Sequence, residues 1–72
     1  MVNMTVSPDL QTLRAFVAVA REGNVSRAAE RLHLSQPAVS LQLKSLATST
    51  GLRLFTRTPQ GLALTRDGAA LL

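Results

Sequence analysis

Apolar side chains recur every three or four residues over the first third of the chain, which is the spacing of an amphipathic helix. The pattern predicts a helix from Pro8 to about Glu22. Its apolar stripe consists of Leu10, Leu13, Phe16, Val17 and Ala20. Ser7 and Pro8 suit the start of a helix, and Gly23 suits an end in the left-handed conformation. Phe16 is in phase with the leucines, so we expect it to anchor a core rather than to stack on a base.

The same periodicity predicts a second, shorter helix from Val25 to about Leu32, with Asn24 as its N-cap. The apolar stripe of this helix has small residues in the middle and consists of Val25, Ala28, Ala29 and Leu32. His33 and Leu34 then form a short connection to a third helix. Two helices joined by such a turn are typical of a helix-turn-helix, and the first helix would supply the third side of the core.

The third helix is predicted over residues 36–49. Ser35 suits its N-cap, Pro37 stands where a missing N–H costs nothing, and Gly51 suits its C-terminal cap. Its apolar stripe is Val39, Leu43 and Leu46. The outward face holds one cation, no acid and several hydrogen-bonding groups, and it consists of Gln36, Pro37, Ser40, Leu41 and Lys44. Such a face suits a DNA groove, but a polar outer face is equally typical of simple solvent exposure.

Two short runs of alternating apolar residues follow, on either side of a turn signal. The three segments are residues 52–57, 58–61 and 62–65. Proline in second place and glycine at the end of the middle segment predict a hairpin. We expect Leu54 and Leu64 to face the core, and Arg53 and Arg57 to point outward. A hairpin after a helix-turn-helix is the wing of a winged helix, and an arginine near its tip suits the minor groove.

Thr65 suits the N-cap of a last helix that runs to Leu72. Because two turns of helix are marginal on their own, we expect this helix to continue in a longer protein. The fold class predicted is mainly α, a winged helix-turn-helix with a three-helix core and a β-hairpin wing. We expect residues 1–6 to be a flexible lead-in, 7–64 to form the DNA-binding domain, and 65–72 to begin a linker helix.

Composition limits the chain to one small domain, because it has 72 residues and therefore a small core. It contains no cysteine, which fits a reducing cytoplasm, and no apolar run of the length that a membrane span needs. We therefore expect a cytoplasmic protein without membrane contact.

The net charge is +4, from eight Lys and Arg against four Asp and Glu, and the surplus lies in the later part of the chain. The cations from the second helix onward are Arg27, Arg31, Lys44, Arg53, Arg57 and Arg66. Only Glu30 and Asp67 oppose them there. This distribution favours a polyanionic partner, although a surface charged for solubility is the alternative.

Catalytic chemistry finds little support in the sequence. The single histidine, His33, falls in a predicted turn without an acidic cluster beside it, and no glycine-rich phosphate loop is present. We therefore expect no enzyme, no metal site and no cofactor.

An alternative to DNA binding is a winged helix that binds another protein through its Leu41 face.

Five segments, in this order and spacing, resemble the N-terminal DNA-binding domain of LysR-type transcriptional regulators. They cover most of the chain and comprise Leu13 with Phe16, residues 23–32, residues 35–43, residues 51–57 and residues 64–68. The resemblance implies a bacterial regulator with a winged helix, a dimerising linker helix and a C-terminal effector domain. It also implies a homodimer or tetramer of the full protein through the linker helix, whereas this chain alone should be monomeric. A small-molecule effector would bind only the C-terminal domain.

By the same resemblance, helix 36–49 enters the major groove of double-stranded DNA and the wing, residues 53–64, approaches the minor groove. The residues expected to touch DNA are Arg27, Arg31, Ser35, Gln36, Pro37, Ser40, Leu41, Lys44, Arg53 and Arg57. The arginines and Lys44 would contact phosphates. Gln36 and Pro37 would meet bases and thymine methyl groups. Many family members carry a basic or bulky polar residue where this chain has Leu41, and an acid where it has Ala47.

Overall fold

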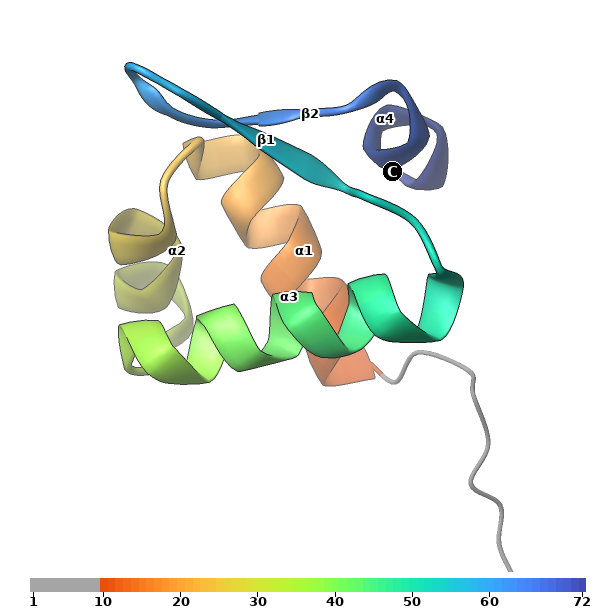
Figure 1. Cartoon of the computed structure of the whole chain (residues 1–72). Helices are drawn as coiled ribbons and strands as arrows, with labels where there is room; N and C mark the ends of the chain where they lie inside the picture. The colour runs from red at the N-terminus through yellow and green to blue at the C-terminus, as the bar shows by residue number, and fades with distance from the viewer. Residues whose placement is uncertain (1–9) are drawn as a thin grey trace, which may run out of the picture.

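The computed structural model describes residues 10–72, in which three helices, a hairpin and a short final helix follow one another (Figure 1). The elements are α1 (Leu10–Glu22), α2 (Val25–Leu32), α3 (Gln36–Thr50), β1 (Phe55–Thr58), β2 (Gly61–Leu64) and α4 (Arg66–Leu71). The predicted fold class, a winged helix-turn-helix, is confirmed. The expected lead-in, residues 1–6, and the expected helix start at Ser7 and Pro8 lie outside the described residues.

Local side-chain chemistry sets the ends of the helices. Asn24, Ser35 and Thr65 each accept a hydrogen bond from the backbone N–H three residues further on, at 2.9, 3.2 and 3.0 Å respectively. Gly23 and Gly51 follow α1 and α3 with φ of 69° and 71°, where a residue with a side chain would be strained. These predicted caps are confirmed, and α3 ends one residue later than expected, at Thr50.

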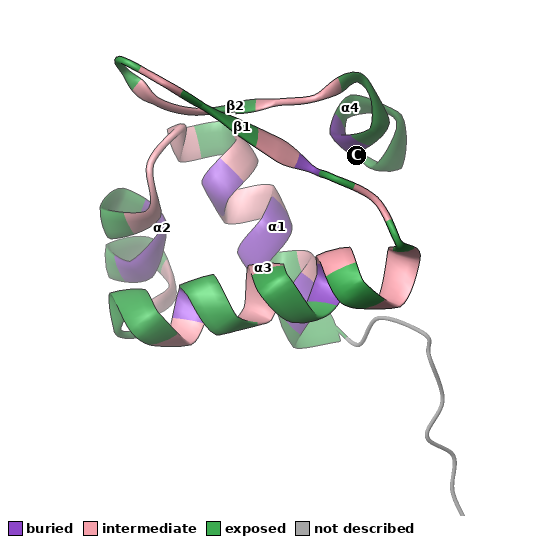
Figure 2. Ribbon diagram, in the orientation of Figure 1, coloured by how far each residue is buried: buried purple, intermediate pink, exposed green. Residues whose placement is uncertain are grey.

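The core lies where α1 crosses α2 and α3 beneath the hairpin (Figure 1). Its buried apolar residues are Ala15, Phe16, Val19, Ala28, Ala29, Val39, Leu46 and Leu54. Phe16 is fully buried, as predicted, and its ring lies 5.6 Å from the ring of Phe55, centroid to centroid. Figure 2 shows the same arrangement, with the buried segments of the helices turned toward one another and the exposed segments turned outward.

The predicted apolar stripe of α1 is correct only in part. Phe16 is buried, and Leu13 and Val17 pack against its cluster, but Leu10 is 70% exposed. Thr12, Ala15 and Val19, which the predicted stripe did not include, are buried as well. The centre of the buried face is therefore rotated by about 100°, one residue step, from the centre of the predicted stripe. Alanine on that face allows α2 and α3 to approach closely, so the small side chains, and not the leucines, decide which side faces inward.

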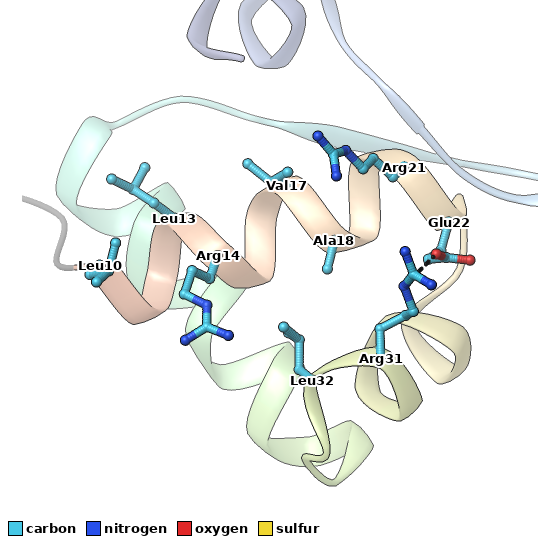
Figure 3. A pocket seen from close by; sticks show the side chains of 9 residues that line it. All are labelled: Leu10, Leu13, Arg14, Val17, Ala18, Arg21, Glu22, Arg31 and Leu32. Atoms are coloured by element: carbon cyan, nitrogen blue, oxygen red, sulfur yellow. Dashed lines mark ion pairs between the residues drawn. The ribbon is translucent and has the colours of Figure 1, made fainter.

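Three residues of the predicted stripe, Leu10, Leu13 and Val17, help to line an open hollow of about 400 Å³ between α1 and α2 (Figure 3). Leu13, Val17 and Ala18 line it from α1, and Leu32 projects from α2 toward the side of α1 that holds Ala18. Arg14 and Arg21 lie at its margin.

The hairpin is antiparallel and pairs Phe55 with Leu64 and Thr58 with Gly61. Leu54 is buried and Leu64 packs against the same core cluster, as predicted. The expected start of the first strand at residue 52 is wrong, because β1 begins at Phe55. The second strand ends at Leu64, because Thr65 caps α4, so the residues before Phe55 have no partner strand.

A close backbone approach fastens the wing to the turn between α1 and α2. The N–H of Leu62 donates to the carbonyl oxygen of Gly23 at 3.0 Å. Gly61 has φ of 137°, and a Cβ at this position would collide with that same carbonyl group. The contact places the tip of the hairpin beside the start of α2, although the two are far apart in sequence.

Candidate nucleic-acid interface

The outer face of α3 is exposed along its whole length. Val39 and Leu46 are fully buried and fix the orientation of the helix, so the opposite side is turned to solvent (Figure 2). The exposed residues of that side include all five predicted ones, Gln36, Pro37, Ser40, Leu41 and Lys44. This face contains no acidic residue, and neither does the rest of α3. It therefore presents hydrogen-bonding groups and one positive charge without any group that repels phosphate.

Next to this face, α2, α3 and the wing enclose an open, mostly polar hollow of about 470 Å³. Gln36 and Ser40 line it from α3, and Arg57 lines it from β1. The fold thus brings Arg57 of the wing together with Gln36 and Ser40 of α3. None of the lining residues is acidic, so the guanidinium group of Arg57 dominates the charge of the hollow.

Sequence reasoning missed several polar residues of this hollow. Asn24 and Ser26 line it from the start of α2, and Gln60 lines it from the tip of the wing. The backbone contact between Gly23 and Leu62 and the packing of Leu62 on the core bring these elements together, so no local pattern could reveal the set. One indication of this set was present in the sequence, the predicted capping role of Asn24, because that role marks where α2 begins. A helix start carries partial positive charge, which adds to that of Arg57.

The other predicted residues of α3 and the wing are exposed but do not line the hollow. Pro37, Leu41 and Lys44 are exposed on α3, and Arg53 is exposed just before β1. Ser35 is exposed as well, and its Oγ accepts the N–H of Ala38 at the start of α3.

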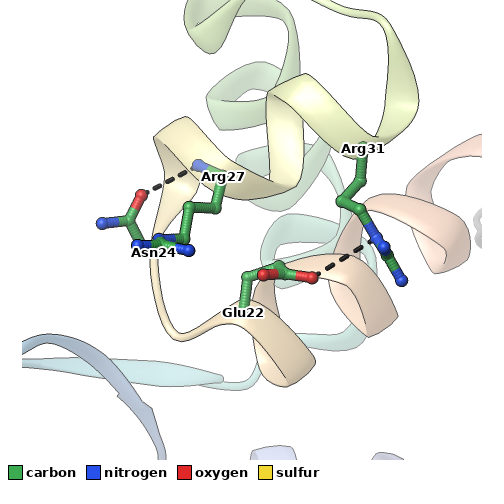
Figure 4. A network of polar contacts seen from close by, with 4 residues as sticks. All are labelled: Glu22, Asn24, Arg27 and Arg31. Carbon is green, nitrogen blue, oxygen red and sulfur yellow. Dashed lines mark hydrogen bonds and ion pairs between the residues drawn. The ribbon is translucent and has the colours of Figure 1, made fainter.

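Arg27 and Arg31 are placed differently. Together with Glu22 and Glu30 they line a separate pocket of about 290 Å³ at the junction of α1 and α2. Arg31 Nε lies 3.4 Å from a carboxylate oxygen of Glu22, and Figure 4 shows this ion pair beside Arg27. Because the Arg31 side chain is 68% exposed, the pair contributes little to stability. The structure therefore does not bring these two arginines together with Arg57.

In the region that the structure covers, residues 10–72, no helix is long and apolar enough to cross a membrane. The same residues contain no cluster of three or more His, Cys, Asp or Glu side chains that could hold a metal ion.

The arrangement of two crossed helices, a third supporting helix and a hairpin defines the class of winged helix-turn-helix domains. Residues 10–69 match the model of the bacterial regulatory helix-turn-helix proteins of the lysR family. The chain belongs to this family.

Relatives and solved structures agree with this assignment. The chain is 50% identical over 64 residues to the HTH-type transcriptional regulator TfdS of Cupriavidus pinatubonensis. These 64 residues make up 89% of this chain and 22% of TfdS. The chain therefore spans about one fifth of the length of such relatives. The DNA-binding domain of CbnR in complex with DNA superimposes with a TM-score of 0.84 at 41% identity, covering 89% of this chain and 74% of that chain. The oxidized form of OxyR from Corynebacterium glutamicum superimposes with a TM-score of 0.87 at 36% identity, and the match covers 92% of this chain and 21% of the OxyR chain.

Proposed function

We propose that this chain binds double-stranded DNA with sequence preference, with α3 in the major groove and the wing at the adjacent minor groove. One observation carries the proposal: the exposed, acid-free face of α3 is continuous with a polar hollow that contains Arg57. A helix with such a face fits the width of the major groove, where base edges offer donors and acceptors. The similar structures of CbnR and BenM domains in complex with DNA support it.

In this arrangement the site residues divide into two roles. Gln36, Pro37, Ser40 and Leu41 face base edges, whereas Ser35 and the cations face phosphates. Lys44, Arg53 and Arg57 would supply most of the phosphate affinity, because they lie on or beside α3 and the wing. Arg27 and Arg31 would add less, since two carboxylates share their pocket.

The full protein that contains this domain is proposed to be a cytoplasmic transcriptional regulator without catalytic activity. We further propose that the helix that begins with α4 continues and joins two or more copies, and that a C-terminal domain binds a small-molecule effector. This 72-residue chain by itself would be a monomer that binds single half-sites weakly.

The test is a fluorescence anisotropy titration of a labelled random duplex with the chain at several salt concentrations. If about four to six phosphates are neutralised, the logarithm of the binding constant should fall with the logarithm of salt at a slope of about −4 to −5. No binding at low salt would contradict the proposal. Duplex binding that persists unchanged at high salt would contradict phosphate contacts as its source. The alternative, a protein partner on the Leu41 face, would be supported by binding of that partner that persists at high salt.

A further inference from the structure

Leu41 places an aliphatic side chain in the middle of the polar face of α3. It is 66% exposed, whereas Leu43 is half-buried and Leu46 is fully buried. At about 100° per residue, Leu41 lies on the opposite side of the helix from buried Val39 and Leu46. It therefore adds little to the core and meets whatever α3 binds.

The exposure of Leu41 differs in kind from that of the other exposed leucines. In residues 10–72 the large exposed hydrophobic residues are Leu10, Leu34, Leu41, Leu71 and Leu72. Leu10 is the first residue of α1, Leu71 and Leu72 lie at the end of α4, and Leu34 lies in the turn before α3. Among these five, Leu41 alone has helical turns on both sides, so neither a helix end nor a turn explains its exposure.

The neighbours of Leu41 make a narrow apolar strip with polar borders. Side chains of a helix lean toward its N-terminus, so Leu41 leans over Pro37, one turn earlier, which is also exposed. Ser40 and Lys44 stand on the same exposed side of the helix. An apolar strip set among hydrogen-bonding groups and a cation suits a polyanionic surface that displays small apolar groups.

The apolar group that the major groove displays is the C5-methyl group of thymine. We propose that Leu41 is a specificity residue that detects a C5-methyl group on the pyrimidine facing it. This inference rests on the proposed DNA binding and goes beyond it. The contact depends on the methyl group and not on the pairing edge, so 5-methylcytosine at the same place should satisfy it too. The domain would then distinguish thymine from uracil, and methylated from unmethylated cytosine.

The experiment uses a duplex that the 72-residue chain enriches from a random pool. Deoxyuridine replaces thymine at one position at a time, which removes the methyl group and leaves base pairing intact. Anisotropy titrations then compare the unmodified chain, Leu41→Ala and Leu10→Ala. Leu10 is a matched control, because it is an equally exposed leucine on α1. A second series places cytosine or 5-methylcytosine at the position that responds to uracil.

At one position, uracil should weaken binding of the unmodified chain by about fourfold, the effect of losing one buried methyl group. Leu10→Ala should show the same loss, and Leu41→Ala should show none. In the second series, methylation of cytosine should strengthen binding of the unmodified chain by about fourfold and leave Leu41→Ala unchanged.

The inference would be overturned, with DNA binding intact, by equal uracil losses in the unmodified chain and Leu41→Ala, or by no uracil loss at any position of the enriched duplex. An enriched sequence without a preferred thymine would overturn it as well. Failure to bind any duplex at low salt would reject the proposed function itself, and the inference with it.

Discussion

The side chain of Gln36 occupies the first turn of α3, where it is exposed and lines the hollow together with Ser40 and Arg57. A glutamine amide can donate to and accept from one adenine at the same time, which is worth about 1 to 3 kcal/mol of base preference. At the scale of single residues, sequence preference therefore depends on few atoms, and Gln36 supplies two of them.

We predict that Gln36→Ala weakens binding to an enriched duplex by about 1 to 3 kcal/mol and leaves binding to a random duplex unchanged. Gln42→Ala is the matched control in the same helix, because Gln42 is half-buried and donates to Gln11 at 3.4 Å. Anisotropy titrations with both duplexes measure the difference. Equal losses on the two duplexes would show that Gln36 does not read bases.

Gly61 is the residue on which the position of the wing depends. We predict that Gly61→Ala lowers the free energy of unfolding by more than Gly51→Ala does. Both glycines have positive φ, which costs about 1 to 2 kcal/mol for alanine. Only at Gly61 would the new Cβ also collide with the Gly23 carbonyl, whereas it meets nothing within 4 Å at Gly51. Urea unfolding followed by circular dichroism compares the two variants, and equal stability losses would speak against a close contact.

At the scale of elements, the proposed roles differ: α3 contacts the bases of the DNA, and the wing adds contacts to its phosphates. We predict that Arg57→Ala makes the salt slope shallower by about 1, because one phosphate contact releases about 0.9 counterion. Arg14→Ala is the control, since Arg14 lines the hollow between α1 and α2, which lies outside the proposed DNA interface. Its slope should equal that of the unmodified chain. An unchanged slope for Arg57→Ala would place the wing away from the phosphates.

The elements also show how far the sequence predicts this structure. Helix ends were predicted well, because Asn24, Ser35 and Thr65 act within three residues of their own position. The buried face of α1 was predicted only in part, because α2 and α3 pack closely against small side chains such as Ala15 and leave the larger Leu10 exposed. Local rules fix where a helix begins and ends, and packing between helices fixes which side is buried.

The same limit applies to the candidate site. The exposed face of α3 followed from the positions of Val39 and Leu46 within one helix, and the predicted residues of that face are indeed exposed. The participation of Ser26 and Gln60 followed only from the contact that brings the wing to α2. Whether the ten predicted residues touch DNA stays a prediction.

At the scale of the whole molecule, two surfaces differ sharply in character. The face formed by α3, the start of α2 and the wing is polar and contains no acidic residue in its hollow. The hollow on the outer face of α1 is lined mainly by apolar residues, and its charged residues are Arg14, Arg21, Arg31 and Glu22 (Figure 3). Positive charge is present on both surfaces, so the hydrogen-bonding groups of the first surface, and not charge alone, favour DNA there.

The most direct test of this account follows the amide chemical shifts of the isotope-labelled chain during titration with an enriched duplex. We predict that the shifts change most for residues 36–44 of α3, for residues 57–61 of the wing and for Ser26, and change little for Leu13 and Val17 of α1. That pattern would place DNA on the polar face. Changes concentrated on the outer face of α1, with α3 and the wing unaffected, would contradict the account.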